Sequence, residues 1–525
     1  MKVYTGLYLW STAQIRWNCH ETVVAVTSVA TITMKVVNWL WLRPKKYEKL
    51  LKDQGFHGNP YRLLRGDMLE FAAMAKENRP KQIKLSDNVS FHALPYIHSI
   101  IKKYGKKAFI WFGPTPSIQV INPEQIREIM SKPRTFHKMH PNPLGDMILG
   151  GLISSEDTKW SRDRKIMNPA FHLAKLKIML PEIHQSCDEM IKKWETLVLV
   201  TGSAEIDVWP SLEDLSGDVI SRTAFGSNYE EGRRIFNLQK EQVELTLQLM
   251  KFVVFPGWRY LPIKANKRMK TVCNKIQILL RGIISKRQEA MKVGEIKKDD
   301  LLGLLLQSNS EEIKENGIGM DIEEVMQECK LFYFAGSETT SNLLVWTLIM
   351  LSTHPEWQTR AREEVVQAFG SRKPDFDGLN HLKIVTMVLQ EVLRLYPPAS
   401  MLTRSVPKDA KLGNINLSAG MIFTVPVILL HHDPEIWGKD SLEFKPERFS
   451  EGVSSATKGK YSYIPFGGGP RICIGQNLAM VEAKVALAMI LQRFRFQLSP
   501  SYVHAPFPIL TLQPQHGASL ILHQL

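Results

Sequence analysis

Cysteine is scarce in this 525-residue sequence, which has only five, scattered between positions 19 and 473. So few and so dispersed cysteines exclude a disulfide-stapled secreted domain and a paired zinc knuckle. Repeats of about 20–50 residues and long Gly/Ser-rich linkers are also missing, which excludes repeat arrays and low-complexity tails. Beyond residue 42 no apolar run reaches about 18 residues, so a multi-span transporter is excluded as well.

Acidic residues are outnumbered: 67 Lys and Arg stand against 52 Asp and Glu, a formal net charge of +15. Such an excess favours an anionic neighbour, which can be a membrane surface, an acidic partner protein or nucleic acid. The charge is dispersed and no recognised nucleic-acid-binding module is present, so we expect no nucleic-acid partner. Hydrophobic residues (44%) and charged residues (23%) occur in the proportions of a globular protein.

One apolar stretch stands out at residues 23–42 (VVAVTSVATITMKVVNWLWL), where 14 of 20 residues are apolar. That length is about what a helix needs to span a bilayer core. Trp39 and Trp41 lie where an interfacial aromatic belt falls, and the basic residues from Arg43 onward predict that the rest of the chain is cytosolic. We therefore predict a transmembrane anchor at 23–42, after a segment of mixed polarity at 1–22. A buried or amphipathic N-terminal helix is the alternative.

Residues 43–525 alternate helical patterns with Pro and Gly breaks, which predicts one large, mainly α-helical domain. The longest helical pattern, at 321–353, would run about 50 Å, enough to cross the domain. Short strands are predicted within 108–121 and 411–427, where turn residues separate apolar runs. Residues 311–319 (EEIKENGIG) are predicted to form a polar loop.

Cys473 has an unusual setting, because glycines and Arg471 surround it in the string FGGGPRICIG, just before an apolar helical pattern at 477–491. Glycines let the backbone approach a ligand closely, while backbone amides and the start of a helix favour a thiolate. A thiolate beside a cation that suits a carboxylate is typical of an axial haem ligand near a propionate. A buried structural cysteine in a glycine-rich turn is the alternative.

The helical pattern at 321–353 contains the string AGSETT at 335–340, and a Gly with two adjacent threonines is an unfavourable choice for a helix interior. A Thr hydroxyl can donate to the carbonyl three or four residues earlier, and Gly leaves room beside it. The functional interpretation is a groove beside a cofactor, with an acid and an alcohol that relay protons. The alternative is a mere packing irregularity.

Two pairs of side chains share a helix face by their spacing. Glu391 and Arg394 lie at i and i+3 in a helical pattern that ends at Pro397, and Trp160 and Arg164 lie at i and i+4. Neither pair alone indicates a function, because exposed ion pairs contribute only about 0–1 kcal/mol. A surface arginine and a core tryptophan are the alternatives for the second pair.

Together these strings resemble the motifs of the cytochrome P-450 family. The haem-binding signature Phe-x-x-Gly-x-Arg-x-Cys-x-Gly, the oxygen-activation motif (Ala/Gly)-Gly-x-(Asp/Glu)-Thr-Thr, and the motifs Trp-x-x-x-Arg, Glu-x-x-Arg and Pro-Glu-Arg-Phe occur in family order. The likeness covers essentially the whole chain after residue 40. It implies a mainly α fold with small β-sheets, in which residues 43–525 form a single large haem domain behind one membrane anchor.

The resemblance also assigns roles to individual residues. Cys473 is expected to be the axial thiolate ligand of haem b, with Phe466 packed against its loop. The other expected haem-binding residues belong to the same signature or contact the propionates, and they are Gly469, Arg471, Gly475, Trp160, Arg164 and Arg404.

Further roles concern oxygen activation and support of the ligand loop. Thr339 is expected to hydrogen-bond dioxygen, and Glu338 to feed the proton route. Ala335 and Gly336 are expected to face substrate and haem. A buried structural triad is expected to comprise Glu391, Arg394 and Arg448.

Finer strings, WLRPK at 41–45, GNPYR at 58–62 and DVISRTAFGS at 218–227, look like the plant 72 clan and most like its founding subfamily of terpenoid-modifying microsomal monooxygenases. The implied reaction inserts one atom of O2 into a small hydrophobic substrate, terpenoid or gibberellin-like. Electrons are expected from NADPH through an NADPH–cytochrome P-450 reductase, because this chain has no dinucleotide fingerprint in a strand–helix context. The implied location is the endoplasmic reticulum membrane, with a single span and a cytosolic catalytic domain.

Two other functions stay open. A haem-dependent isomerase or dehydratase would act on a peroxide without a reductase, although the presence of both Thr339 and Glu338 argues against it. A dependence of turnover on NADPH and reductase would discriminate the two. The other is a non-catalytic haem-binding protein, which nothing in the sequence separates from an active enzyme.

Overall fold

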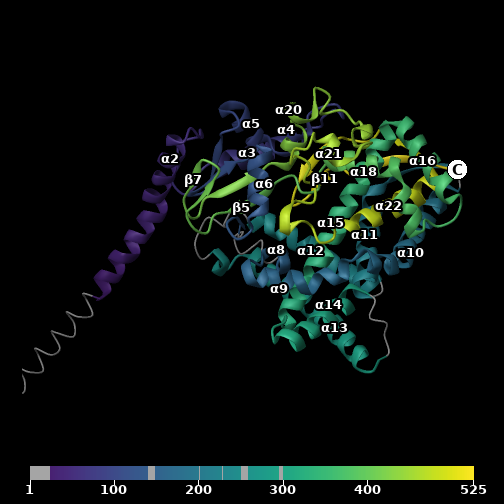
Figure 1. Cartoon of the computed structure of the whole chain (residues 1–525), viewed down its shortest axis with the longest axis horizontal. Helices are drawn as coiled ribbons and strands as arrows, with labels where there is room; N and C mark the ends of the chain where they lie inside the picture. Colours follow the sequence, from purple (N-terminus) through teal and green to yellow (C-terminus); the bar gives the residue numbers. More distant parts are fainter. Residues whose placement is uncertain (1–23, 140–147, 200–201, 227–228, 250–257, 295–299) are drawn as a thin grey trace, which may run out of the picture.

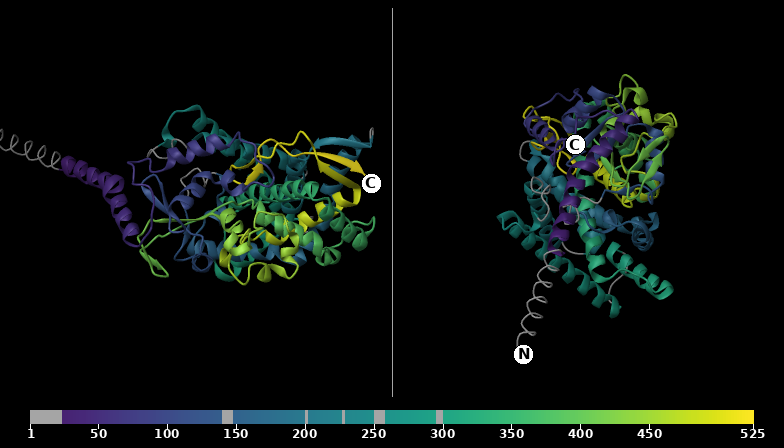
Figure 2. Two further views of the ribbon diagram at one scale, coloured as in Figure 1. Left: turned by 90° about the horizontal axis from the view of Figure 1, so that it is seen from above. Right: turned by 90° about the vertical axis from the view of Figure 1, so that its left-hand side faces the viewer.

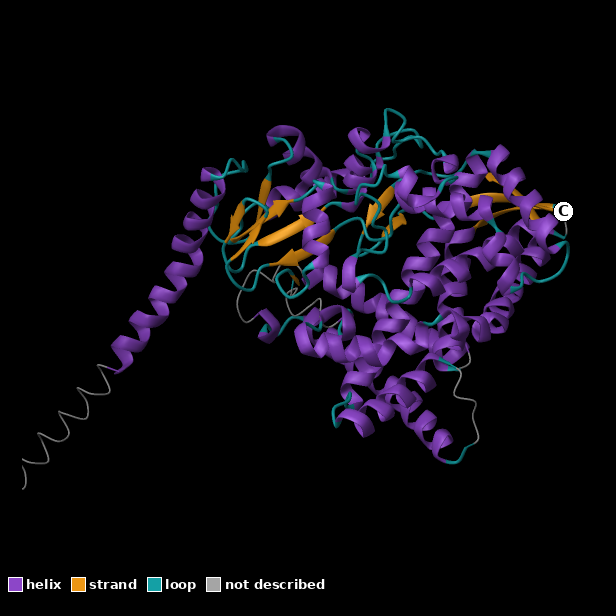
Figure 3. Cartoon of the chain, viewed as in Figure 1, coloured by secondary structure: helices purple, strands orange, loops and turns teal. Residues whose placement is uncertain are grey.

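The computed structural model describes residues 24–139, 148–199, 202–226, 229–249, 258–294 and 300–525. Helices dominate, and the strands of these residues form one five-stranded, one three-stranded and two two-stranded sheets (Figure 3). The prediction of a mainly α fold with small β-sheets is therefore confirmed.

A helix from Val24 to Asp53 projects away from the rest of the molecule (Figure 1; Figure 2). It includes a π-helical turn, η1 (Asn38–Leu42), and ends as α2 (Arg43–Asp53). Its apolar part is not buried by the protein, since Val26 and Ile32 each expose 61% of their surface. By length and composition this helix can cross a membrane, which is compatible with the anchor predicted at 23–42 and not with a buried helix. Residues 1–23 lie outside the described part.

The C-terminal turns of this helix are attached to the body of the molecule. Tyr47 and Leu51 are buried. Arg43 Nη2 donates a hydrogen bond to the Ala419 carbonyl (2.8 Å), and the Tyr61 hydroxyl donates to the Leu40 carbonyl (2.8 Å). These contacts join the projecting helix directly to the β-rich end of the molecule.

The five-stranded sheet has the order β1-β2-β8-β5-β3. Its strands are β1 (Phe109–Phe112), β2 (Thr115–Gln119), β3 (His137–Lys138), β5 (Leu402–Ser405) and β8 (Ile422–Val425). Only β2 and β8 pair in parallel, and the antiparallel pairing of β3 with β5 places Lys138 opposite Arg404. The two segments predicted to be extended contain strands: β1 and β2 in the first, and β8 with most of the hairpin β6 (Ala410–Leu412) and β7 (Ile415–Leu417) in the second.

The helix α15 (Ile322–Thr353) crosses the helical part of the molecule and is almost wholly buried. Asp321 caps it, because its side chain accepts from the Glu324 amide while Glu324 accepts from the Asp321 amide. Pro355 begins α16 (Pro355–Phe369) directly afterwards. The helix predicted at 321–353 is therefore confirmed, with its first residue as the N-cap.

Other long helices pack against α15. They include α11 (Val208–Phe225), α18 (Lys383–Leu395) and α22 (Gln476–Arg493), and α10 (Leu173–Val198) packs in turn on α11 and α22. Further helices are α3 (Met68–Asn78), α4 (Val89–Ala93), α5 (Pro95–Tyr104), α6 (Pro123–Ser131), α8 (Gly151–Ser154), α9 (Asp157–Met167), η2 (Asn168–Phe171), α12 (Tyr229–Leu249), η4 (Trp258–Tyr260), α13 (Lys264–Lys292), α14 (Leu301–Asn316), α17 (Phe376–His381), α19 (Val427–His431), α20 (Pro434–Trp437), η5 (Pro446–Phe449), α21 (Gly452–Ala456) and η6 (Gly469–Arg471).

The loop predicted at 311–319 is wrong for residues 311–316, which belong to α14, and right for 317–319, which follow the helix and begin with Gly317 in the left-handed region (φ +70°). The segment is polar because it is the exposed end of a helix. Side chains four residues apart stabilise it, since Gln307 donates to Glu311 and Asn316 donates to Glu312 (2.8 and 2.9 Å).

Two small sheets contain the C-terminal residues. Strand β12 (Ser519–Gln524) lies between β4 (Ser203–Asp207) and β9 (Phe494–Leu498) and is antiparallel to both. The hairpin of β10 (Pro506–Pro508) and β11 (Leu512–Pro514) touches α15, where Trp346 Nε1 donates to the Leu512 carbonyl (2.9 Å). The end of the chain thereby reaches the central helix.

Candidate active site

The segment from Phe466 to Gly475 is a closed loop before α22. The Cys473 amide donates to the Phe466 carbonyl (3.0 Å), and η6 (Gly469–Arg471) forms the bend between them. Gly469 has a left-handed backbone (φ +64°), and a Cβ there would overlap the Met130 carbonyl. Gly469 is therefore required both by its conformation and by the close approach of α6.

The Cys473 side chain is accessible, although enough protein surrounds it to change its ionisation. The pKa of the Cys473 thiol lies above its usual value, because burial outweighs the hydrogen bonds from the Gly475 and Gln476 amides and the positive charges of Arg164 and Lys138. The amides favour the thiolate, as expected, and so do the cations Arg164 and Lys138, but in the protein alone burial has the larger effect. A metal ion would reverse this balance, since a coordinating thiol loses its proton.

Three cationic side chains gather beside the Cys473 loop. Arg471 is buried, pairs with Glu156 and lies over the Trp160 ring (4.6 Å from Cζ to the ring centre). Burial and the nearby Arg471 lower the pKa of Arg404 to about 10, and burial with both arginines lowers the pKa of Lys138 to about 7. Neither Arg404 nor Lys138 has an acidic side-chain partner within ion-pair distance in the described part of the chain. Such an excess of buried positive charge fits an anionic group.

Helix α9 brings two further predicted residues to this cluster. Trp160 stacks under Arg471, and Arg164 Nη1 donates to the carbonyl of Ile472, the neighbour of Cys473 (2.9 Å). Burial lowers the pKa of Arg164. The four cofactor-edge residues predicted from the motifs thus all lie around one loop.

Sequence reasoning missed Lys138. It reaches the cluster because β3 pairs with β5, which is more than 260 residues away in the chain. No local motif marks such a pairing, and β3 is only two residues long. A basic residue in a short extended segment is the only signal that the sequence offers.

The middle of α15 contributes Thr339 and Glu338. The Thr339 hydroxyl donates to the Ala335 carbonyl (2.7 Å), the back-bond expected from the sequence. Glu338 Oε1 accepts from the Thr511 hydroxyl (2.7 Å). Burial raises the pKa of Glu338, while the Thr511 hydrogen bond and the charge of Lys240 oppose that rise.

Gly336 lies where α15 meets α11. A Cβ at Gly336 would overlap Ile220 of α11, so the absence of a side chain lets the two helices approach closely. Ala335 next to it is half-buried.

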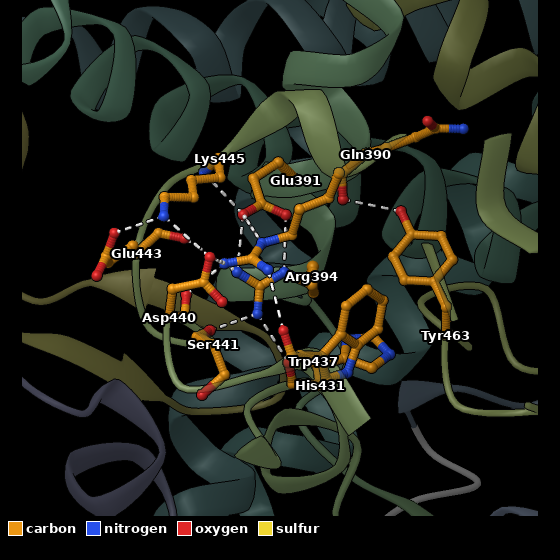
Figure 4. Close-up of polar contacts among 11 residues, drawn as sticks. Gln390, Glu391, Arg394, His431, Trp437, Asp440, Ser441, Glu443, Lys445 and Tyr463 are labelled. Carbon is orange, nitrogen blue, oxygen red and sulfur yellow. Dashed lines mark hydrogen bonds and ion pairs between the residues drawn. The ribbon is translucent and has the colours of Figure 1, made fainter. Parts of the chain in front are cut away.

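The third group of residues centres on Glu391, which with Arg394 is completely buried (Figure 4). Both carboxylate oxygens of Glu391 accept from Arg394 (2.7 Å each), and Arg448 Nε lies 3.4 Å from Glu391 Oε1. The remaining Arg394 hydrogens reach the carbonyls of His431 (2.9 Å) and Ser441 (2.5 Å). The second guanidinium, that of Arg448, also pairs with Asp440 (3.0 Å) and donates to the Trp437 carbonyl (3.0 Å).

This group connects to the Cys473 loop. The Tyr463 hydroxyl donates to the Gln390 carbonyl (2.9 Å), beside Glu391 (Figure 4). His431 makes two such contacts. Its main-chain carbonyl accepts from Arg394, and its ring Nε2 accepts from the Ile464 amide (3.0 Å). The segment just before Phe466 is therefore held by the residues around the Glu391 cluster.

The residues of the sequence motifs thus lie in three groups: the Cys473 loop with its cations, the middle of α15, and the Glu391 cluster. Comparison with known proteins identifies the family. A family model described as Cytochrome P450 matches residues 90–521. The chain is a cytochrome P450. Among its relatives, cytochrome P450 CYP72A219 of Panax ginseng is 55% identical over 505 residues, which cover 95% of this chain and 98% of that protein.

Other relatives place this P450 among the plant CYP72 enzymes. Cytochrome P450 72A397 of Kalopanax septemlobus is 56% identical over 494 residues, with 94% of this chain and 95% of the relative covered. The 7-deoxyloganic acid hydroxylase of Catharanthus roseus is 51% identical over 499 residues, with 94% and 96% covered. This P450 is thus a monooxygenase, and its family implies a haem with a cysteine thiolate and O2 as co-substrate.

Proposed function

We propose that Cys473 holds the iron of haem b, and that Lys138, Arg404, Arg471, Arg164 and Trp160 surround its carboxylate edge. The observation that carries this assignment is that the buried Arg404 and the half-buried Lys138 lie beside an accessible sulfur without an acidic side-chain partner in the described part of the chain, a charge that two propionates would supply. When bound, the haem would supply the chemistry that activates O2 for insertion into a C–H bond.

Glu338 and Thr339 would move protons on the α15 side. The Thr339 hydroxyl donates its hydrogen bond to the Ala335 carbonyl, so the Thr339 oxygen can still accept a hydrogen bond from another group. Glu338 is half-buried and burial raises its pKa, which suits a group that takes up and releases a proton. Together they would deliver protons to the co-substrate while the surrounding apolar residues exclude bulk water.

The substrate would be a hydrophobic molecule of the terpenoid class or a gibberellin-like acid. The strings shared with the terpenoid-modifying subfamily and the relative named as a hydroxylase of 7-deoxyloganic acid support this assignment. Electrons would come from NADPH through a reductase. The net charge of +15 suits docking to a reductase with an acidic surface.

The protein would reside in the endoplasmic reticulum membrane with its catalytic domain in the cytosol. The projecting helix from Val24 to Asp53 and the basic residues from Arg43 onward support this topology. Protease treatment of sealed microsomes should then digest the chain beyond Arg43, and a protected catalytic domain would contradict the orientation.

The test of the proposed function uses the full chain with its haem. We expect the reduced, CO-bound protein to show the red-shifted Soret band of a thiolate ligand, and Cys473→His to give an imidazole-like band instead. An imidazole-like band in the unchanged protein would overturn the assignment of Cys473.

Turnover is then measured with reductase, NADPH and those terpenoid acids that shift the haem spectrum. A hydroxylated product that requires NADPH is expected. A product formed from a peroxide without NADPH would instead favour an isomerase or dehydratase, and spectral binding without any product a non-catalytic haem protein.

A further inference from the structure

The turn between β10 and β11 places a hydroxyl on the Glu338 carboxylate. Thr511 is buried, and its Oγ1 lies 2.7 Å from Glu338 Oε1. It comes from the far end of the chain, 173 residues after Glu338. None of the sequence motifs includes it.

The direction of this hydrogen bond is determined by a third residue. Asn342 Nδ2 donates both to Thr511 Oγ1 (2.9 Å) and to the Glu338 main-chain carbonyl (2.7 Å). An amide nitrogen can only donate, and turning the amide over would place its oxygen against that carbonyl. Thr511 therefore accepts from Asn342, which leaves its single proton for Glu338.

The turn itself is held on α15. Glu338, Asn342 and Trp346 lie at i, i+4 and i+8, hence on one face of the helix. Trp346 Nε1 donates to the Leu512 carbonyl (2.9 Å), and the Leu512 amide donates to the Pro398 carbonyl (3.0 Å). Leu512, the residue directly after Thr511, is therefore held through both its amide and its carbonyl, so the hydroxyl cannot turn away easily.

We propose that Thr511 is a positioning residue for Glu338: it holds the carboxylate in one orientation and favours its ionised form. This inference rests on the proposed role of Glu338 in proton delivery. A hydroxyl that donates to a carboxylate stabilises the charged form, and one oxygen held in this way leaves the other to take up the proton.

The charged groups that face Glu338 come from two neighbouring helices. Lys240 of α12 favours the ionised carboxylate, whereas Glu213 of α11 is paired with Lys240 (2.8 Å) and repels the charge of Glu338. Because Lys240 is shared in this way, removal of the Thr511 hydroxyl should not be compensated by these charges. The pKa of Glu338 should then rise further.

The experiment compares Thr511→Val, which keeps the volume and loses the donor, with Thr511→Ser, which keeps the donor. Thr347→Val is the matched control, because Thr347 lies buried on the same helix and donates only to its own Leu343 carbonyl (2.6 Å). Each full-length protein is loaded with haem and reduced under CO. The infrared C–O stretch is followed against pH, and peroxide released per NADPH is measured with reductase.

We expect Thr511→Val to move the pH midpoint of the C–O stretch upward and to raise peroxide release about threefold or more, in line with loss of a hydrogen bond to a charged group. Thr511→Ser and Thr347→Val should behave like the parent. If Thr511→Val does not load haem, Thr511→Ala carries the same expectation.

Glu338→Gln separates the two hypotheses. If it raises peroxide release while neither Thr511→Val nor Thr511→Ala does, the inference about Thr511 is wrong and the role of Glu338 stands. If Glu338→Gln itself changes neither peroxide release nor the pH dependence of the C–O stretch, the proposed role of Glu338 fails, and the inference with it.

Discussion

At the scale of single residues, Glu391 is the residue with the most demanding environment. Its fully buried carboxylate faces two guanidinium groups, that of the equally buried Arg394 and that of the partly exposed Arg448. Removing the charge of one member leaves the charges of the others uncompensated. The loss of folding free energy is then larger than the contribution that the intact group makes to stability. The adjacent Tyr463 and His431 contacts transmit any displacement to the loop of Cys473.

We therefore expect Glu391→Gln to destabilise the protein by about 3–5 kcal/mol and to lose most of its bound haem. The measurement is the ratio of haem to protein, together with the spectrum of the reduced, CO-bound form. Glu447→Gln, at an exposed position near Arg448, is the control and should load haem normally. Normal haem content in Glu391→Gln would show that the cluster does not support the ligand loop.

At the scale of elements, the crossing of α11 and α15 depends on Gly336, where Ile220 occupies the space of a side chain. This close contact between the two helices sets the position of Ala335, Glu338 and Thr339, which lie on α15 beside Gly336, relative to α11. Well-packed interiors resist an added methyl group, because neighbours must leave their preferred rotamers.

We expect Gly336→Ala to destabilise the protein by about 1–3 kcal/mol, through overpacking against Ile220. The double variant Gly336→Ala with Ile220→Ala should recover part of this loss, which thermal unfolding would reveal. Gly282→Ala in α13 is the matched control, since open space surrounds Gly282 and the change there should be neutral or slightly stabilising. Equal effects at the two glycines would contradict a role of Gly336 in the crossing.

Elements with strong local signals could be predicted from the sequence. The capping box at Asp321 and the following Pro355 delimit α15, and Gly-Asn at 413–414 lies in the β6–β7 turn. The loop predicted at 311–319 failed over 311–316 because polarity was taken as a loop signal, although there it belongs to the exposed end of a helix. Composition alone cannot distinguish a polar loop from the exposed end of a helix.

The site residues divide in the same way. Cys473, Thr339 and Glu391 lie in motifs of contiguous residues, so their clusters could be anticipated. Lys138 and Thr511 enter the site through long-range contacts, a two-residue strand pairing and a hairpin turn, which carry no local signature. The pKa of Cys473 could not be predicted either, because it depends on burial as well as on the neighbouring amides.

At the scale of the whole molecule, the core contains an acid that no motif explains. Glu482 of α22 is fully buried and accepts from Ser216 of α11 (2.7 Å), so it joins two long helices. Burial raises the pKa of Glu482 from its ordinary value of 4.5 to about 8. Glu482 is thus protonated at neutral pH and makes global stability depend on pH.

The sign of that dependence follows from proton binding. Between pH 4.5 and about 8 the folded chain keeps a proton that the unfolded chain releases, so the contribution of Glu482 to stability is complete below this window and is lost as pH rises through it. We expect Glu482→Gln, which keeps an acceptor for Ser216, to be more stable than the parent near pH 8 by about 1 kcal/mol or more.

Unfolding by urea at several pH values measures this difference. The loss of stability between about pH 5 and 8 should be smaller in Glu482→Gln than in the parent. Glu363→Gln, an exposed position on α16, should leave the pH dependence unchanged. Parallel curves for the parent and Glu482→Gln would contradict the buried, protonated state of Glu482.

The C-terminal residues have a consequence for the order in which the enzyme is made. Strand β12 and Thr511 lie in the last 15 residues, yet they pair with β4 and touch the middle of α15. Chains fold from the N-terminus as they leave the ribosome, so these contacts can form only after α15 and the Cys473 loop have been synthesised. A premature stop codon after residue 510 would therefore keep Cys473 and the whole cationic cluster, but would remove the hydroxyl that holds the Glu338 carboxylate.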